Sequence, residues 1–173
     1  MIQWYTHIAN HHNVKELLLT LCCLFIACFF APRVRAQDSL YNRNIYFELG
    51  GSAGVGSFNY EHSLIEKEWY QLRWSAGLSV FPSDKNNGIV FVIPTLLHWL
   101  VGKTESKAEI GIGQALSVTT KASGFSMLTP FIGYRYQHPR YRWIYRVTYT
   151  PIISYLVQYQ YQHWFGLSVG YQW

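Results

Sequence analysis

The last ten residues of the chain alternate strictly in character. In residues 164–173, WFGLSVGYQW, every odd position from Phe165 onward is bulky and apolar or aromatic, and every even position from Gly166 onward is Gly, Ser or Gln. Successive side chains of a β-strand point to opposite faces. The segment is therefore predicted to be a strand with one apolar face and one small, polar face.

A terminal strand of this kind that stops on an aromatic residue resembles the C-terminal assembly signal of bacterial outer-membrane β-barrels. Phe165, Tyr171 and Trp173 are the positions that match it. The resemblance implies that the last strand closes a barrel against the first, that its apolar face contacts outer-membrane lipid, and that the barrel assembly machinery recognises the segment.

The same alternation recurs in residues 70–80, 108–118, 128–136 and 143–150. Each run has about ten residues, the length of a tilted strand that crosses a bilayer. Short polar segments separate the runs, at residues 82–88, 103–107, 121–124 and 137–140. The pattern predicts an all-β fold, an antiparallel up-and-down transmembrane β-barrel of about eight strands, within a range of roughly seven to ten. An eight-stranded barrel has an interior just filled by side chains.

Three regions leave the strand pattern open. Residues 44–62 change phase among glycines at 50, 51, 54 and 56, so either a bulge or a turn fits there. Residues 141–161 alternate for too long to cross once, and Pro151 is the favoured position of a bend or turn. Residues 89–101 are apolar on both faces, which suits a strand or a short helix.

A soluble β-sandwich or lipocalin-like cup is the alternative, because its strands alternate too. Its outer face would carry Lys, Glu and Thr at high density, whereas the polar face here holds Gly, Ser, Gln and isolated charges. Aromatic residues make up 18% of the chain and gather near the predicted strand ends, as in the aromatic girdles of membrane barrels. These features favour the membrane barrel.

The first 36 residues have the character of an export signal. Their apolar run, residues 17–31, is shorter than the ~20 residues of a membrane-spanning helix and suits a signal-peptide core. An uncleaved anchor, or a lipoprotein signal at Cys28, is the alternative. All three cysteines lie in this segment, so no disulfide is expected in the mature chain. The predicted organisation is a signal peptide (1–36), a short N-terminal segment (37–43) and one outer-membrane β-barrel (44–173).

The charge of the mature chain is mild. Residues 37–173 contain 11 Lys and Arg and 8 Asp and Glu, a net charge of +3. The basic residues are spread singly, so nothing indicates nucleic-acid binding.

Five charged residues fall on the predicted inner face: Glu48, Arg73, Glu109, Arg135 and Arg146. Charges in a narrow, poorly hydrated interior must pair. They are predicted to form a network of salt bridges that plugs the lumen, the alternative being a small polar pore or ligand site.

One run holds the residue types of a Ser-His-Glu hydrolase: His62, Ser63 and Glu66. Outer-membrane lipid A deacylases use such a triad on an eight-stranded barrel. Adjacent His62 and Ser63 point to opposite faces of a strand, however, so a polar strand end is the preferred interpretation. The isolated histidines His98, His138 and His163 are interpreted as rim residues, and no metal or cofactor is predicted because no ligand pair, phosphate loop or nucleophile elbow occurs.

Segments YFELGG (46–51), FNYE (58–61), ESKAEIGIG (105–113) and FIGYRYQ (131–137) resemble the repeated signatures of small, largely uncharacterised outer-membrane barrels of Bacteroidota-type bacteria. The resemblance implies a barrel in the outer membrane of a Gram-negative bacterium, and no activity. The chain is predicted to be a monomer. The predicted function is a structural or surface-interaction role, with a lipid-modifying hydrolase or a narrow solute channel as alternatives.

Overall fold

Most strands pair with their neighbours along the chain, and the first and last strands pair with each other. The computed structural model describes residues 42–82, 88–120, 124–138, 140–154 and 160–173. The predicted signal peptide and residues 37–41 lie outside this range. The elements are β1 (Arg43–Gly50), η1 (Gly51–Ala53, a 3₁₀ turn), β2 (Gly56–Glu66), β3 (Tyr70–Pro82), β4 (Ile89–Val101), β5 (Ser106–Thr119), β6 (Gly124–Leu128), β7 (Phe131–Gln137), β8 (Trp143–Ser154) and β9 (Gln160–Gln172).

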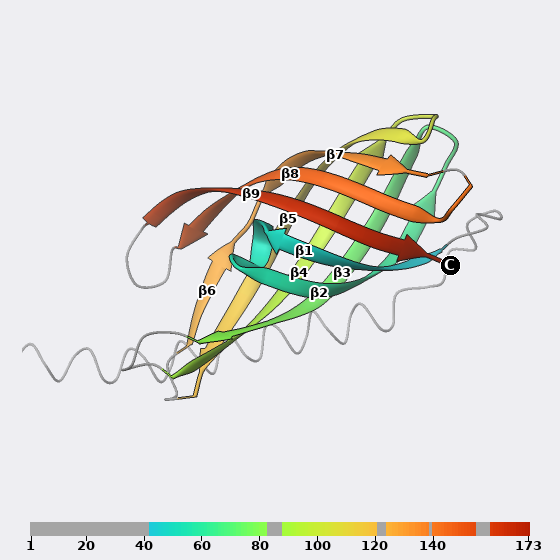
Figure 1. Ribbon diagram of the computed structural model, residues 1–173. Helices are drawn as coiled ribbons and strands as arrows, with labels where there is room; N and C mark the ends of the chain where they lie inside the picture. Colours follow the sequence, from blue (N-terminus) through green and yellow to red (C-terminus); the bar gives the residue numbers. More distant parts are fainter. Residues whose placement is uncertain (1–41, 83–87, 121–123, 139, 155–159) are drawn as a thin grey trace, which may run out of the picture. The chain divides into compact units, whose positions relative to one another are not determined.

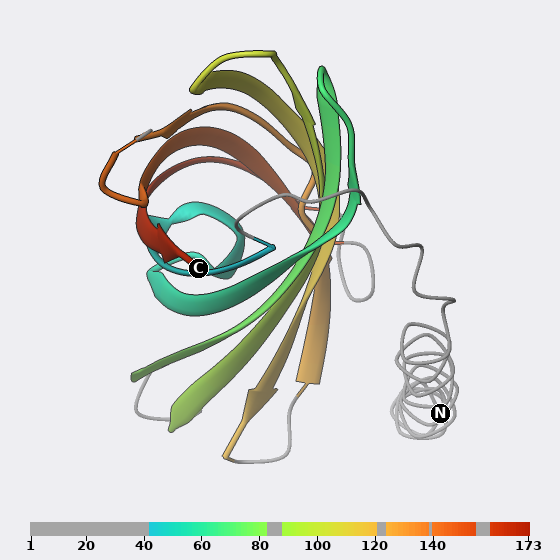
Figure 2. The ribbon, with the colours of Figure 1, turned by 90° about the vertical axis from the view of Figure 1, so that its right-hand side faces the viewer.

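The pairing closes the sheet into a ring. Every pair is antiparallel, and β1 pairs with β2 on one side and with β9 on the other, placing Phe47 opposite both Phe58 and Val169. Figure 1 shows β9 beside β1, and Figure 2 shows the ring from one end. The predicted fold class, an antiparallel up-and-down all-β barrel, is confirmed.

The sheet has nine strands where about eight were predicted, because one crossing is interrupted. β6 and β7 follow each other in the chain, and both lie between β5 and β8. The interruption falls at Thr129 and Pro130, and Pro130 has no N–H to donate to a ladder. Nine strands therefore occupy eight positions around the ring.

Two predictions about individual segments are resolved by the pairing. Residues 89–101 form strand β4. The bend or turn expected at Pro151 does not occur there, because β8 continues to Ser154 and Pro151 lies within it opposite His163. On its other side, β8 faces the interruption at Pro130, between its pairings with β7 and β6. A proline is tolerated there because that side of the ladder needs no donor.

The phase change after residue 49 is a turn whose tip lies inside the barrel. Gly50, Gly51 and Gly54 have positive φ angles, which glycine adopts without a steric penalty. The three residues of η1 are buried, and Ala53 packs against Val90, Val92 and Ala115 in a small apolar cluster. The β1–β2 turn thus fills the interior with its own residues.

The two faces of the sheet are sorted in the opposite sense to a soluble protein. The inner face carries buried polar side chains: Glu61 and Arg135 are 0% exposed. The outer face carries exposed apolar side chains, among them Phe58 at 67% and Phe165 at 68%. No helix among the described residues is long and apolar enough to span a bilayer.

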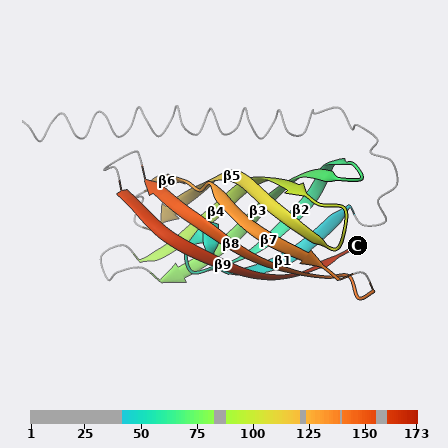
Figure 3. The ribbon, with the colours of Figure 1, turned by 90° about the horizontal axis from the view of Figure 1, so that it is seen from above.

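The barrel has two distinct ends. The start of β1, the end of β9 and the turns β2–β3, β4–β5 and β7–β8 lie at one end, here called the termini end (Figures 1 and 3). The opposite end is here called the loop end. There β1 ends and β2 begins before the neighbouring strands β9 and β3 reach their own ends. Within the described residues, β3 after residue 78 pairs only with β4, and β9 before residue 166 pairs only with β8. Two free strand edges therefore flank the β1–β2 turn.

Candidate functional site

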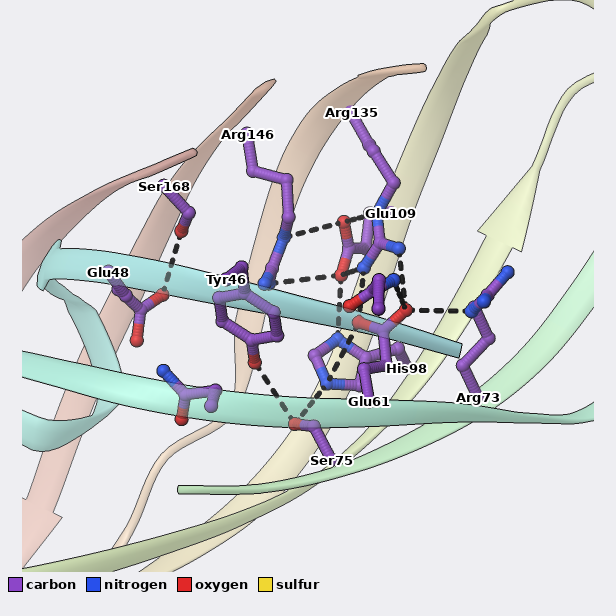
Figure 4. Close-up of polar contacts among 12 residues, drawn as sticks. Tyr46, Glu48, Glu61, Arg73, Ser75, His98, Glu109, Arg135, Arg146 and Ser168 are labelled. Atoms are coloured by element: carbon purple, nitrogen blue, oxygen red, sulfur yellow. Dashed lines mark hydrogen bonds and ion pairs between the residues drawn. The ribbon is translucent and has the colours of Figure 1, made fainter. Parts of the chain in front are cut away.

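Arg135 lies at the centre of a buried ionic network inside the barrel (Figure 4). Its Nη1 and Nη2 donate to the two carboxylate oxygens of Glu61, at 2.7 and 2.8 Å. Its Nε and Nη2 donate to the two oxygens of Glu109, both at 2.9 Å. One planar guanidinium therefore bridges two carboxylates with four charge-assisted hydrogen bonds, which fits the fork of donors that arginine presents.

Three different strands bring these groups together. Glu61 lies on β2, Glu109 on β5 and Arg135 on β7, each at an inward position of the alternation. Glu109 is paired with Gly133, the inward neighbour of Arg135 along β7, so no side chain stands between the acid and its base. A Cβ at Gly133 would lie 2.5 Å from the Val147 carbonyl oxygen, so this position favours glycine.

Two further arginines flank the centre along the barrel axis. Toward the termini end, Nε of Arg73 lies 2.7 Å from Oε1 of Glu61, an ion pair whose angle does not suit a hydrogen bond. Toward the loop end, Arg146 contacts Glu109 through Nε at 3.2 Å and Nη2 at 3.1 Å. The guanidinium carbon of Arg146 lies 4.6 Å from the ring centre of Tyr46, a cation–π contact.

A chain of neutral groups ends on the same acid. Tyr46 Oη lies 3.0 Å from Ser75 Oγ, Ser75 Oγ lies 2.7 Å from Nε2 of His98, and Nδ1 of His98 lies 2.7 Å from Oε1 of Glu109. An ionised carboxylate only accepts, so Nδ1 of His98 carries a proton. In the neutral imidazole, Nε2 then accepts from Ser75, and Tyr46 donates to Ser75. Ser75, His98 and Glu109 thus have the hydrogen-bond order of a serine-hydrolase triad.

Burial decides the energetics of this network. Three guanidiniums contact two carboxylates, and the groups are at most 3% exposed. Removing one partner of a buried ion pair costs about 3–5 kcal/mol because the other charge is left uncompensated. The groups hold each other in place, and the centre of the lumen is occupied by protein.

The five predicted lumen charges do not all meet. The structure brings together Arg73, Glu109, Arg135 and Arg146. Glu48 lies apart, where its carboxylate accepts from the Ser52 backbone N–H at 3.3 Å and the Ser52 hydroxyl at 3.0 Å, with Ser168 Oγ at 3.5 Å. Glu48 therefore anchors the inward turn η1 and does not contact an arginine in the central network.

The weak catalytic candidates do not assemble into a triad. Ser63 Oγ donates to Glu66 at 3.3 Å, and Gln71 Nε2 donates to Glu66 at 2.8 Å. His62 and Ser63 are consecutive in β2 before its irregularity, so their side chains leave opposite faces. The histidine that does meet a serine and an acid is His98.

His98 is a correction to the sequence interpretation, which placed it at a rim. It is 0% exposed and lies at the middle of the network. The other two predicted rim histidines are not buried. Half-buried His138 accepts through Nδ1 from the backbone N–H groups of Arg140 and Tyr141 in the β7–β8 turn, and exposed His163 contacts Tyr149 on the outer face. Within the described ranges, no group of three or more His, Cys, Asp or Glu is arranged to hold a metal ion.

Sequence reasoning missed Glu61, Ser75, His98 and Tyr46 as network members. Glu61 was not among the predicted lumen charges, yet β2 continues to Glu66 and keeps Glu61 inward. The signal was available for Glu61 and Ser75, because both share the small, polar face of their alternating runs. It was absent for His98, since β4 is apolar on both sides of it and only pairing with Arg73 and Gly111 sets its direction.

The predicted assembly-signal residues lie together on the outer face of β9. Phe165, Tyr171 and Trp173 are 68%, 42% and 41% exposed. Tyr171 packs edge-on against Trp143 of β8 at 5.8 Å between ring centres, and Trp173 lies 6.5 Å from Tyr60 across β1. This strand completes the ring.

Comparisons with known proteins give a single fold-level result. No family model matches the chain, and no curated protein matches it in sequence. Among solved structures it is similar to Ail, the attachment invasion locus protein of Yersinia pestis, at 12% identity and a TM-score of 0.43, over 76% of this chain and 94% of Ail. At that identity and score, no activity or partner is transferred.

Proposed function

We propose that this chain is a monomeric outer-membrane β-barrel of a Gram-negative bacterium, with a plugged lumen and a structural or surface-interaction role. The observation that carries the proposal is the sorting of side chains, with ionic groups fully buried inside the ring and large apolar groups exposed around it. In water this arrangement leaves a large apolar belt exposed, which marks a membrane surface. In a bilayer the same belt is solvated by lipid.

Dimensions and aromatic positions agree with a bilayer. A tilted strand needs about 9–11 residues to cross, and six of the nine strands have 11 or more. Aromatic side chains gather outside at the termini end, as in the Trp69–Tyr70 and Trp143–Tyr171 pairs, and again toward the loop end around Tyr149 and His163. Two such girdles are typical of the two membrane interfaces.

The surface role is supported by the free edges at the loop end. Unpaired strand edges expose rows of N–H and C=O groups that can accept a further strand. The edge of β9 between residues 160 and 165 is the longer one, and its inward side chains Gln160 and Gln162 are exposed as well. We place the termini end, where β1 starts and β9 ends, at the periplasmic side, so this edge faces the exterior of the cell.

The proposal is tested first by heat-modifiability. We expect the detergent-folded protein to migrate differently on a denaturing gel before and after boiling, and to be recovered with outer membranes. Gln162→Cys is then expected to react with an impermeant maleimide on intact cells, and Lys103→Cys, in the β4–β5 turn, only after permeabilisation. A soluble periplasmic protein without a mobility shift would contradict the membrane assignment, and the reverse labelling pattern would contradict the orientation.

One observation favours a second function, a serine hydrolase. Ser75, His98 and Glu109 make both triad hydrogen bonds at 2.7 Å. Two observations argue against a hydrolase. All three residues are 0% exposed, and the Ser75 hydroxyl is hydrogen-bonded to Tyr46. A nucleophile has to reach its substrate, so this function requires the lumen to open.

A fluorophosphonate probe separates the two functions. The closed barrel predicts no labelling of folded protein, in detergent or in lipid. Covalent labelling that is lost in Ser75→Ala and kept in the matched Ser79→Ala, another buried serine of β3, would establish the hydrolase. A third possibility, a solute channel, predicts discrete conductance in planar bilayers, which the plugged lumen does not.

A further inference from the structure

The lumen contains an unmatched cation at its termini end. Arg73 is 1% exposed. Besides its ion pair with Glu61, it makes one hydrogen bond to a described residue, a long one of 3.4 Å from Nη1 to Oε1 of Gln71. Within the described part of the chain, Nη2 has no hydrogen-bond partner. Figure 4 shows the end of this guanidinium directed away from the central network. A buried donor on a charged group without a partner is costly, so a group that accepts hydrogen bonds is expected beside it.

The acceptors nearby are already used. Glu61 Oε1 accepts from Asn44 and Arg135 while it also pairs with Arg73, and its Oε2 accepts from Arg135. Glu66 accepts from Ser63 and Gln71. Neither carboxylate can turn to Nη2 of Arg73 without breaking hydrogen bonds that it makes now.

A second cation lies on the same side of the network. Lys107 precedes Glu109 by two residues in β5, so it shares the inward face and lies closer to the termini end. It is about half-buried and interacts electrostatically with Arg73, Arg135 and Glu66. No ion pair involving Lys107 is formed within 4.0 Å among the described residues.

The charges around this end of the lumen are nearly balanced. Lys107, Arg73, Arg135 and Arg146 supply four positive charges, and Glu61, Glu66 and Glu109, with Glu105 in the adjoining turn, supply four negative ones. The cluster therefore offers little excess charge to a multiply charged anion. Glu66 repels a multiply charged ligand, so the ligand that fits best carries a single charge and two or more acceptor oxygens.

We propose that Arg73 and Lys107 form a binding site for a singly charged oxyanion at the termini end of the lumen. Nη2 of Arg73 donates to one oxygen, and Nη1 can exchange its long bond to Gln71 for a second, giving the bidentate geometry that arginine makes with carboxylates and phosphates. The ammonium of Lys107 adds charge from the open side. A carboxylate and a phosphodiester share this chemistry.

The site is tested on the full chain folded in a zwitterionic detergent. Sodium acetate and dimethyl phosphate are titrated separately while the side-chain Nε–H resonance of Arg73 is followed by NMR, with sodium chloride at matched ionic strength as the baseline. Saturable shifts with either oxyanion are expected, and the arm with the lower Kd identifies whether carboxylate or phosphodiester is preferred.

Two lysine variants decide the assignment. Lys107→Met is expected to raise Kd by about tenfold or more, the effect of losing one charge-assisted hydrogen bond. The matched Lys103→Met, in the exposed β4–β5 turn, is expected to leave Kd within about twofold. Shifts that stay linear and equal those with chloride would overturn the site, and so would equal effects of the two variants. Neither variant alters the outer face, so these results are independent of the membrane assignment.

Discussion

Replacing Arg135 by methionine is predicted to destabilise the barrel more than any other single removal of a lumen charge. Four hydrogen bonds of 2.7–2.9 Å are lost, two from each of Glu61 and Glu109. The gross value of charged hydrogen bonds, about 1.5–3 kcal/mol each, overstates the effect. Glu61 keeps Arg73 and an amide, and Glu109 keeps Arg146 and His98. The expected loss is therefore about 3–5 kcal/mol, the value for leaving a buried ion unpaired.

A graded series makes this prediction quantitative. Arg146→Met removes contacts of 3.1 and 3.2 Å to one carboxylate, Glu109, and the cation–π contact with Tyr46. Glu109 keeps its two bonds from Arg135, so a loss of about 1–3 kcal/mol is expected. Arg135→Lys keeps the charge but not the planar fork, and should fall between Arg135→Met and wild type. Arg140→Met, in the exposed β7–β8 turn, is the control, with less than about 0.5 kcal/mol.

The measurement is urea unfolding in phospholipid vesicles, followed by tryptophan fluorescence; the chain contains seven tryptophans. The reasoning fails if Arg135→Met costs less than about 1 kcal/mol, or no more than Arg146→Met. Either result would mean that water or a shift of Arg73 replaces the Arg135 bridge between Glu61 and Glu109. The side chains of the lumen would then rearrange more easily than their geometry implies.

Three further predictions test other parts of the molecule. Ile112→Arg, on the outer face of β5 where Ile112 is 51% exposed, should cost about 2–4 kcal/mol by urea unfolding in vesicles, whereas an exposed site in water would tolerate it. Gly51→Ala should destabilise the barrel in the same assay by at least about 1 kcal/mol more than Gly54→Ala. Both glycines have positive φ, but only a Cβ at Gly51 would meet the carboxylate of Glu48, at 2.5–2.7 Å. Trp173→Ala should reduce the heat-modifiable species in outer membranes while changing the stability of purified, folded protein by less than about 1 kcal/mol; equal losses in both would make Trp173 a packing residue only.

The alternation of side chains predicted most of the strands, because a strand with one apolar face has few ways to bury or solvate it. The resemblance of the last strand to a barrel assembly signal predicted the closed topology. The alternation failed where the backbone departs from regular pairing. The interruption at Pro130 and the continuation of β8 through Pro151 are two sides of one irregularity, and each proline alone suggests a turn. Only the register shows that the two prolines lie near each other.

The sequence predicted that a network of paired charges fills the lumen, but not which residues form it. Charges on the inner face had to pair, and four of the five chosen residues do contact the network. Which acid meets which base depends on the height of each strand in the ring. That height comes from the register, which places Glu61 of β2 beside Arg135 of β7, 74 positions later in the chain. A residue such as Glu48 has the right face but the wrong height.

Two barriers of different chemistry lie one after the other along the lumen, and together they restrict what the barrel can do. The first is the ionic network around Arg135, and the second is the inward turn η1. Opening the first means freeing Arg135 from two carboxylates. At about 3–5 kcal/mol, that opening holds the open form to roughly one molecule in 10²–10⁴. Opening the second means withdrawing η1, which Glu48 anchors and which packs against the apolar cluster around Ala53.

A polar solute must pass both barriers. The two respond to different perturbations, since charge neutralisation loosens the ionic network and leaves the apolar cluster in place. The fraction open at both is the product of two small numbers unless a ligand couples them. The structure therefore favours a role that the ends and outer surface of the barrel perform, and it places any chemistry of the lumen at the termini end, beside buried Arg73 and half-buried Lys107.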